Sequence, residues 1–209
     1  MKLPEVREAV VESCRDLCRS ELMCYLGAGG NVSVRDRETG LIALTPSQLR
    51  YDTMTADDIV VVDRDGMVVE AREDRIPTSE LPTHTLVYRE QDAVNAIVHT
   101  HAPISTAVAS VLDAIPALTY ELLYFAGRSV PVIPFTMPGT REMAESVAGA
   151  LRSTTAVIIR NHGMFAVGGT LHEAVVRAVA LEDAARLFHL ARTIGEPHLL
   201  PDHIEKPGP

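Results

Sequence analysis

The chain has 209 residues, 46% of them hydrophobic, and its 19 basic and 28 acidic side chains give a net charge of −9. This composition excludes a disordered or fibrous chain, and scattered arginines on an acidic chain argue against binding to a nucleic-acid backbone. Apolar runs stop short of the roughly 18 residues that a membrane span needs, and residues 1–5 turn polar too early for a signal peptide. The cysteines at 14, 18 and 24 are not a disulfide framework. We therefore expect a cytoplasmic enzyme with neither a membrane nor a nucleic-acid partner.

Hydrophobic periodicity predicts both helices and strands along the chain. A helix is expected over residues 4–25, followed by a meander of short strands at 31–34, 41–44, 59–62 and 67–69. Further helices are expected at 79–90, 104–112, 140–151 and 170–193, and further strands at 93–99, 118–120, 130–134, 156–159 and 164–167. These elements predict one α/β domain over residues 1–194, an αβα arrangement whose central, mostly antiparallel sheet is covered by helices. A proline-rich tail is expected over residues 195–209.

Two histidines close a predicted buried strand. His99 and His101 flank one threonine, and strand geometry points both imidazoles to the same face, with Cα atoms about 6.6 Å apart. That spacing suits joint binding of one metal ion, although two incidental surface histidines would give the same pattern. His162, between two apolar strands, is the favoured third ligand. Three neutral histidines with open coordination positions are typical of a catalytic zinc site.

Three loops carry groups that could bind an anion. The Gly-Gly-Asn segment at 29–31 could direct several backbone N–H groups to one point. Hydroxyl groups gather at residues 45–47 and at residues 78–79. Each loop alone is more typical of a turn or a helix cap, although the helix that begins near Glu80 would also suit a phosphate group. His84 is either a packing residue of that helix or a residue that orients a neighbour.

Several of these segments recur in one fixed order: GAGGNVSVR (27–35), LTPS (44–47), PTSE (77–80), HTH (99–101), Tyr120, GTRE (139–142) and NHG (161–163). As an ordered set they resemble the class II aldolase/adducin family, and within it the branch of L-fuculose-1-phosphate aldolases. The resemblance spans residues 5–193, which is nearly the whole chain.

The resemblance implies a nine-stranded αβα domain, a homotetramer and one zinc ion per chain held by His99, His101 and His162. It implies that Glu80 is the catalytic acid/base and can also contact the metal. Tyr120 matches a tyrosine that reaches the neighbouring subunit's site and protonates the leaving aldehyde oxygen. The positions that match the family's substrate-phosphate site are Gly30, Asn31, Ser47, Thr78 and Ser79.

The implied activity is zinc-dependent cleavage of a ketose 1-phosphate, such as L-fuculose 1-phosphate, to dihydroxyacetone phosphate and a small aldehyde. Zinc replaces a Schiff-base lysine in this chemistry, and the chain's only lysines, Lys2 and Lys206, lie outside these motifs. Alternatives on the same zinc site are a sugar-phosphate 4-epimerase, a methylthioribulose-phosphate dehydratase and a related decarboxylase. A non-enzymatic alternative is an adducin-like interaction domain, which has no need of the metal ligands.

Some positions separate these alternatives. Gln48 stands where the aldolases usually carry glycine, and the tail lacks the C-terminal tyrosine that closes the fuculose enzyme's site, so the aldehyde stays open. Residues 51–62 and 82–84 resemble the sister L-ribulose-5-phosphate 4-epimerase. That epimerase carries aspartate at the position of Glu80 and lysine at the position of Thr45, and both differences favour an aldolase.

Overall fold

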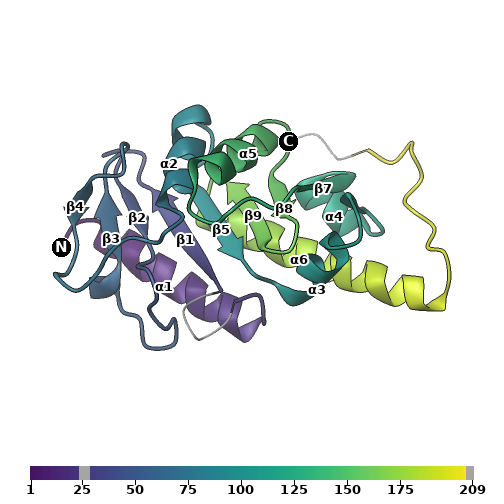
Figure 1. Ribbon diagram of the computed structural model, residues 1–209, viewed down its shortest axis with the longest axis horizontal. Helices are drawn as coiled ribbons and strands as arrows, with labels where there is room; N and C mark the ends of the chain where they lie inside the picture. Colours follow the sequence, from purple (N-terminus) through teal and green to yellow (C-terminus); the bar gives the residue numbers. More distant parts are fainter. Residues whose placement is uncertain (24–28, 206–209) are drawn as a thin grey trace.

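The computed structural model describes residues 1–23 and 29–205, which form a mixture of strands and helices (Figure 1). The strands are β1 (Gly30–Arg35), β2 (Ile42–Leu44), β3 (Val60–Val62), β4 (Val68–Glu70), β5 (Ala96–Thr100), β6 (Ala114–Pro116), β7 (Ser129–Ile133), β8 (Ala156–Ile159) and β9 (Gly163–Gly168). The helices are α1 (Pro4–Arg19), the 3-10 helix η1 (Ala56–Asp58), α2 (Leu81–Glu90), α3 (Pro103–Ala109), α4 (Tyr120–Ala126), α5 (Arg141–Leu151) and α6 (Leu171–Ile194).

The strands form one 9-stranded sheet in the order β4-β3-β2-β1-β5-β9-β8-β7-β6. Neighbouring strands pair antiparallel, except for the parallel pair β7 and β8. The prediction of a mostly antiparallel central sheet is therefore confirmed. The strand β5 lies in the middle of the sheet between β1 and β9. It contains His99, and His101 directly follows it.

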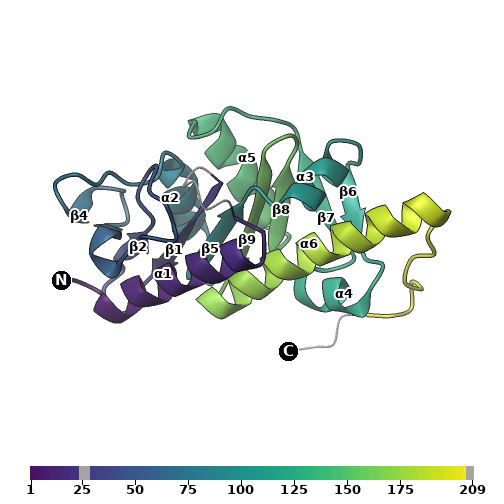
Figure 2. The ribbon, with the colours of Figure 1, turned by 90° about the horizontal axis from the view of Figure 1, so that it is seen from below.

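Helices cover both faces of the sheet. Helices α1, α3, α4 and α6 pack on one face and share a core cluster with one set of strand side chains, while α2 and α5 pack on the other. Figure 2 shows α1 and α6 crossing the near face, with α5 on the opposite side. Successive side chains of a strand point to opposite faces, so Ala43 joins the first cluster and its neighbours Ile42 and Leu44 join the second. Burial on both faces explains why the central strands read as continuous apolar runs.

Threonine residues cap the two helices that were predicted to begin at residues 140 and 170. The hydroxyl of Thr140 accepts a hydrogen bond from the backbone N–H of Met143, and that of Thr170 accepts one from Glu173. Each cap satisfies an otherwise unpaired N–H of a first helical turn and contributes about 1 kcal/mol.

Three predicted elements differ clearly from the structure. The first helix ends at Arg19 rather than 25, because the N–H of Leu22 turns back to the carbonyl of Leu17 and directs Leu22 into the core. The strand predicted at 118–120 is wrong: the strand lies at Ala114–Pro116, and Tyr120 begins helix α4. Leu122, Leu123 and Ala126 are the buried residues of α4, a helical rather than an alternating spacing. Helix α3 ends at Ala109 rather than 112.

Some expectations fall on residues 24–28 and 206–209, which lie outside the described residues. They are Cys24, the end of the predicted first helix, the first glycine and alanine of the 27–35 motif, and the last residues of the tail.

The start of the tail packs against the domain. After α6 ends at Ile194, residues 195–205 contain no helix or strand. The Arg128 guanidinium donates hydrogen bonds to backbone carbonyls of the tail, including those of Pro201 and Asp202 at 2.9 and 2.7 Å. Leu200 and Ile204 pack against the core. Over the described ranges, no helix has both the length and the apolar character of a membrane span.

Candidate active site

His99 is held rigidly near the end of β5. Its Nδ1 lies 2.8 Å from the carbonyl oxygen of Met164 on β9 and therefore donates a hydrogen bond to it. Its ring stacks on Phe165, with centroids 4.1 Å apart and an interplanar angle of 17°. A histidine whose Nδ1 proton is committed to a carbonyl presents the lone pair of Nε2. The local structure therefore prepares His99 as a metal ligand.

His101 and His162 converge on the same point. The Nε2 atoms of His99 and His101 are 3.0 Å apart, and the possible ligand atoms of all three histidines lie within 4.8 Å of one another. His162 reaches the group from the turn between β8 and β9. The structure thus brings together the three histidines that the sequence singled out.

The glycine after His162 permits this approach. A Cβ on Gly163 would lie 2.3 Å from the carbonyl oxygen of Thr100, a distance that real Cβ atoms do not show. The preceding Asn161 has φ 57°, in the left-handed region that asparagine tolerates better than most residues. The Asn-His-Gly sequence therefore fits the sharp turn that carries His162 to β5.

Glu80 immediately precedes α2 and lies among the histidines. Its Oε2 is 3.0 Å from His99 Nε2, and its Oε1 is 3.3 Å from His162 Nε2. Oε2 also accepts a hydrogen bond of 2.7 Å from the side-chain amide of Asn31. Burial alone would raise the pKa of the Glu80 carboxyl, but the neighbouring His99 and hydrogen bonds from His162 and Asn31 lower it. Glu80 is therefore a buried carboxylate, with a side chain only 5% exposed.

These residues fit a divalent metal ion. Burial lowers the pKa of His99 to about 4 and also lowers that of His101, so both rings are neutral at pH 7 and carry a lone pair. Converging lone pairs and a carboxylate repel one another unless a cation or a proton lies between them. Histidine nitrogens with one carboxylate oxygen form a donor set that zinc accepts at about 2.0–2.2 Å. His162 Nδ1 is buried and lacks a hydrogen-bond partner among the described residues.

The loops predicted to bind phosphate are adjacent. The N–H of Ser47 donates to the carbonyl of Ile76, and that of Thr78 donates to the carbonyl of Thr45. The N–H of Thr45 in turn donates to the carbonyl of Val32 in β1. The 45–47 loop is therefore held between the first strand and the 76–78 loop, although 30 residues or so separate the loops in sequence.

The remaining members of this set lie next to Glu80 and His99. Gly30 has φ 135°, and a Cβ there would lie 2.2 Å from the carbonyl oxygen of His99, so only glycine fits against β5. Asn31 pairs directly with His99 across the two strands. Ser79 is exposed beside the buried Glu80. Gly30, Asn31 and Ser79 thus surround the histidine group from the β1 and α2 sides.

Gln48 directly follows Ser47 in the 45–47 loop, whereas Tyr120 lies on a different part of the fold. Gln48 has φ 55°, in the left-handed region that glycine adopts without strain. Tyr120 is 47% exposed on α4, and its ring lies beside that of Tyr124, 6.3 Å away between centroids. Helix α4 packs on β7 and α6, and β7 is separated from β5 by β8 and β9. Tyr120 is therefore not brought to the histidines of its own chain.

Sequence reasoning left His84 open and missed Ser33 and Tyr88. All three are buried, and His84 contacts Asn31 through Nε2 at 2.5 Å and Ser33 through Nδ1 at 2.6 Å. Two sequence spacings could have identified these residues. Asn31 and Ser33, two positions apart, lie on one face of a strand, and His84 and Tyr88, four positions apart, lie on one face of a helix. Polar residues repeated at those spacings on otherwise buried faces indicate a hydrogen-bonded network.

Comparisons with known proteins agree with this geometry. Residues 8–189 match the family described as Class II Aldolase and Adducin N-terminal domain. The chain is 36% identical to the 5-deoxy-D-ribulose 1-phosphate aldolase of Bacillus thuringiensis serovar kurstaki, over 97% of this chain and 92% of that protein. It is also 36% identical to an L-ribulose-5-phosphate 4-epimerase of Salmonella typhi, over 92% of this chain and 87% of that protein.

A solved structure of an L-fuculose 1-phosphate aldolase superposes with a TM-score of 0.89 at 35% identity, covering 97% of this chain and 93% of that chain. The family resemblance and the nine-stranded αβα fold that it implied are thereby confirmed. The relatives act as aldolases or as a related epimerase. The chain is therefore an enzyme that belongs to the class II aldolase and adducin family.

Proposed function

We propose that this enzyme is a zinc-dependent aldolase that cleaves a ketose 1-phosphate to dihydroxyacetone phosphate and a small aldehyde. The observation that carries the proposal is the position of Glu80, a buried carboxylate within 3.0 Å of His99 and 3.3 Å of His162. A carboxylate next to a group of metal-ligating histidines suits proton transfer at a carbon beside a carbonyl.

In this proposal His99, His101 and His162 hold one zinc ion per chain, with Glu80 able to contact it. When bound, zinc supplies the Lewis acidity that stabilises negative charge developing at a ketone oxygen. Replacement of His162 by alanine should abolish stoichiometric zinc binding. His172 is an exposed histidine on α6, and the control variant His172→Ala should bind zinc as the parent does. Full zinc content in the metal-reconstituted His162→Ala protein would remove that residue from the ligand set.

The chain's own groups bind and position the substrate. Phosphate is held by the loops that contain Gly30, Asn31, Ser47, Thr78 and Ser79. Binding energy from a phosphate remote from the reacting bond orients the ketone. In the direction of bond formation, the ionised Glu80 removes a proton from carbon 3 of dihydroxyacetone phosphate and becomes protonated. In cleavage the steps run in reverse: the hydroxyl on carbon 4 loses its proton, the bond between carbons 3 and 4 breaks, and the protonated Glu80 returns its proton to carbon 3.

Tyr120 has a role in this scheme only if subunits share sites. Because Tyr120 is half exposed on α4 and apart from the histidines of its own chain, we propose a homotetramer in which it exchanges a proton with the aldehyde oxygen in a neighbouring site. Mixing inactive Tyr120→Phe and His99→Ala subunits should then restore part of the activity. If exchange of subunits is verified and activity does not return, Tyr120 does not complete a neighbour's site.

The decisive experiment measures release of dihydroxyacetone phosphate from a panel of ketose 1-phosphates by the zinc-loaded enzyme. The panel includes L-fuculose 1-phosphate and 5-deoxyribulose 1-phosphate, since relatives of 33–36% identity carry these activities in their names. Release from at least one ketose 1-phosphate is the expected result. A fully metallated enzyme that releases none from any of them contradicts the proposal.

A second candidate is epimerisation at carbon 4 of a pentulose 5-phosphate, favoured by the 36% identity to the Salmonella typhi epimerase. Glu80 and Thr45 argue against it, because the epimerases carry aspartate and lysine there. The same preparation incubated with L-ribulose 5-phosphate distinguishes the two: an epimerase changes the configuration of the pentulose without releasing dihydroxyacetone phosphate.

A further inference from the structure

A continuous series of side-chain hydrogen bonds runs from Glu80 into the layer between the sheet and α2. The amide nitrogen of Asn31 donates to Glu80 at 2.7 Å, and the amide oxygen of Asn31 lies 2.5 Å from His84 Nε2. His84 Nδ1 lies 2.6 Å from the hydroxyl of Ser33, which lies 2.7 Å from the hydroxyl of Tyr88. All five residues are buried, so water does not replace a partner that is lost.

The hydrogen bond at Glu80 gives the direction of the series. The Asn31 amide nitrogen is the group that lies against the Glu80 oxygen, and an amide NH₂ only donates hydrogen bonds. The Asn31 oxygen then faces His84 and can only accept, which requires a proton on His84 Nε2. A reversed Asn31 amide would place two acceptors 2.7 Å apart at Glu80.

The other end of the series agrees with this direction. Burial lowers the pKa of His84 to about 3, so the ring is neutral and carries a single proton. With that proton on Nε2, Nδ1 must accept a hydrogen bond, and the Ser33 hydroxyl supplies it. The Tyr88 hydroxyl then donates to Ser33, either to the hydroxyl oxygen at 2.7 Å or to the backbone carbonyl at 3.0 Å.

We propose that His84 is a positioning residue that fixes the Asn31 amide with its NH₂ group toward Glu80 and the substrate. This proposal rests on the proposed aldolase function. One N–H of Asn31 holds Glu80, and the second remains available for a phosphate oxygen. Because His84 lies one turn after Glu80 on α2, it also ties the helix that follows Glu80 to the strand that carries Asn31.

The first test reads the tautomer of His84 directly and needs no substrate. In the zinc-loaded wild type labelled with ¹⁵N-histidine, the His84 signals, identified by their loss in His84→Gln, should show a protonated Nε2 and an unprotonated Nδ1. The opposite tautomer would reverse every bond of the series and overturn the proposal. An enzyme that proves inactive on every ketose phosphate contradicts the proposed function, yet this measurement still decides the orientation of Asn31.

The second test measures exchange of the carbon 3 proton of dihydroxyacetone phosphate with deuterated water. His84→Leu removes both nitrogens and should lower the exchange rate about 10–100-fold, the usual effect of losing a partner that orients an active-site group, with zinc content unchanged. His84→Gln keeps an N–H near the position of Nε2 and should recover most of that rate. Dihydroxyacetone without phosphate should show a smaller loss in His84→Leu, since only the phosphate uses the second N–H of Asn31.

A matched variant separates positioning from stability. Val87→Ala shortens a buried side chain on the same helix without touching the series, and it should keep the parent exchange rate. If His84→Leu does not fold, Ser33→Ala replaces it, with an expected loss of about 10-fold. The proposal is wrong if the folded, zinc-loaded variants exchange at the parent rate, or if His84→Gln and His84→Leu lose activity equally.

Discussion

Two buried carboxylates of this enzyme have opposite surroundings. Glu182 on α6 is 2% exposed, and its two oxygens accept hydrogen bonds of 2.9 and 2.8 Å from the backbone N–H groups of Ile104 and Ser105 at the start of α3. Glu80 is equally buried, but its neighbours include the Nε2 atoms of His99 and His162, which are acceptors when the rings present their lone pairs to a metal.

The difference shows that the groups around a buried carboxylate, rather than its burial, decide whether it stabilises the fold or is available for binding and proton transfer. Backbone N–H groups at a helix start are fixed donors that satisfy a carboxylate permanently. Nitrogen lone pairs that converge with a carboxylate leave a site whose repulsion only a cation or a proton relieves. The α3–α6 junction is therefore complete by itself, whereas the group around Glu80 needs a cation or a proton to relieve its repulsion.

The largest expected effect follows replacement of Glu80 by glutamine. The variant keeps the size of the side chain but cannot accept the carbon 3 proton, so proton exchange on dihydroxyacetone phosphate should fall about 10²–10⁴-fold. Circular dichroism and zinc content should stay at parental values, because His99, His101 and His162 remain. A folded, zinc-loaded Glu80→Gln protein that exchanges at the parent rate would mean that Glu80 only begins a helix.

Glu182→Ala should show the reverse pattern, a loss of stability. Two buried N–H groups at the start of α3 would lose their acceptor, which predicts a decrease of about 2–4 kcal/mol in the free energy of unfolding. The neighbouring Asp183→Ala, at an exposed position of the same helix, should change it by less than about 0.5 kcal/mol. Urea unfolding of the three proteins measures both values, and equal stabilities would contradict the structural role of Glu182.

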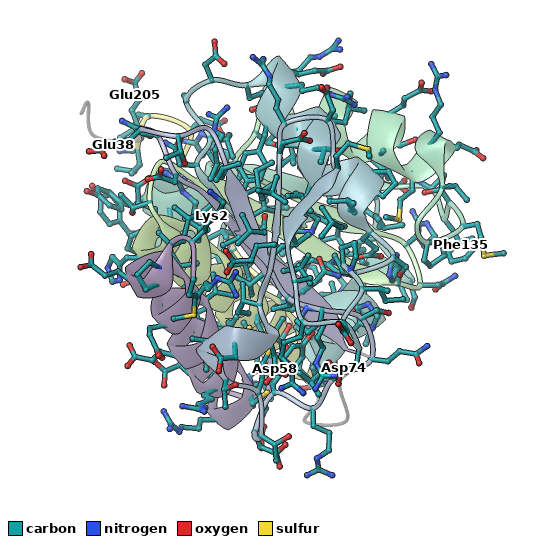
Figure 3. All side chains as sticks on the ribbon, turned by 90° about the vertical axis from the view of Figure 1, so that its left-hand side faces the viewer. Lys2, Glu38, Asp58, Asp74, Phe135 and Glu205 are labelled. Carbon is teal, nitrogen blue, oxygen red and sulfur yellow. The ribbon has the colours of Figure 1, made fainter. Side chains whose placement is uncertain are left out.

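A third buried carboxylate, Asp58, sharpens the comparison through its pH dependence. Burial alone would raise its pKa, but hydrogen bonds from the backbone and hydroxyl of Thr55 and from the Arg75 guanidinium lower it. Arg75 also pairs with Asp74, and the two aspartates lie beside each other in Figure 3. Because the pKa is lower in the folded state, the stabilisation is complete above the unfolded value of about 3.9 and is lost as the pH falls through the folded value.

The expected result is a difference in stability between wild type and Asp58→Asn of about 1–3 kcal/mol at pH 7. That difference should shrink as the pH is lowered from about 5 toward 2, because the wild-type carboxyl becomes protonated. Urea unfolding at a series of pH values measures it. A difference that is constant over this range would show that the charge of Asp58 contributes nothing.

Local patterns predicted most of the elements and the three histidines that converge in the structure. Alternation placed His99 and His101 on one face, and apolar runs on either side placed His162 in a turn. The two antiparallel pairings of β5 then bring Asn31 and Met164 to the histidines, and such long-range register does not follow from periodicity. For the same reason the spacings of Ser33 and Tyr88 indicate buried polar faces but do not identify their partners, which depend on α2 lying over β1.

Tyr120 illustrates another limit. Its aromatic ring and the β-branched residue before it favour a strand locally, whereas the burial of Leu122, Leu123 and Ala126 against the core favours a helix. Packing of the following residues decided the outcome, which is information that a short window around residues 118–120 does not contain.

The smallest expected effect concerns backbone strain in the 45–48 loop, which we propose to bind the substrate phosphate. Gln48 directly follows Ser47, and Asn161 directly precedes His162. Both are among the described non-glycine residues with positive φ, whereas no such residue lies at the start of α3. Gln48→Gly should raise the free energy of unfolding by up to about 1 kcal/mol, since relief of left-handed strain of about 1–2 kcal/mol exceeds the added entropy of an unfolded glycine. Gln48→Ala keeps the left-handed backbone strain and should change the free energy of unfolding by only about 0.2–0.5 kcal/mol. Gly40→Ala, at φ 71° with no atom within 4 Å of its Cβ position, supplies the inverse control and should lose about 1 kcal/mol. Thermal or urea unfolding that finds Gln48→Gly no more stable than Gln48→Ala would show that this loop stores no backbone strain at Gln48.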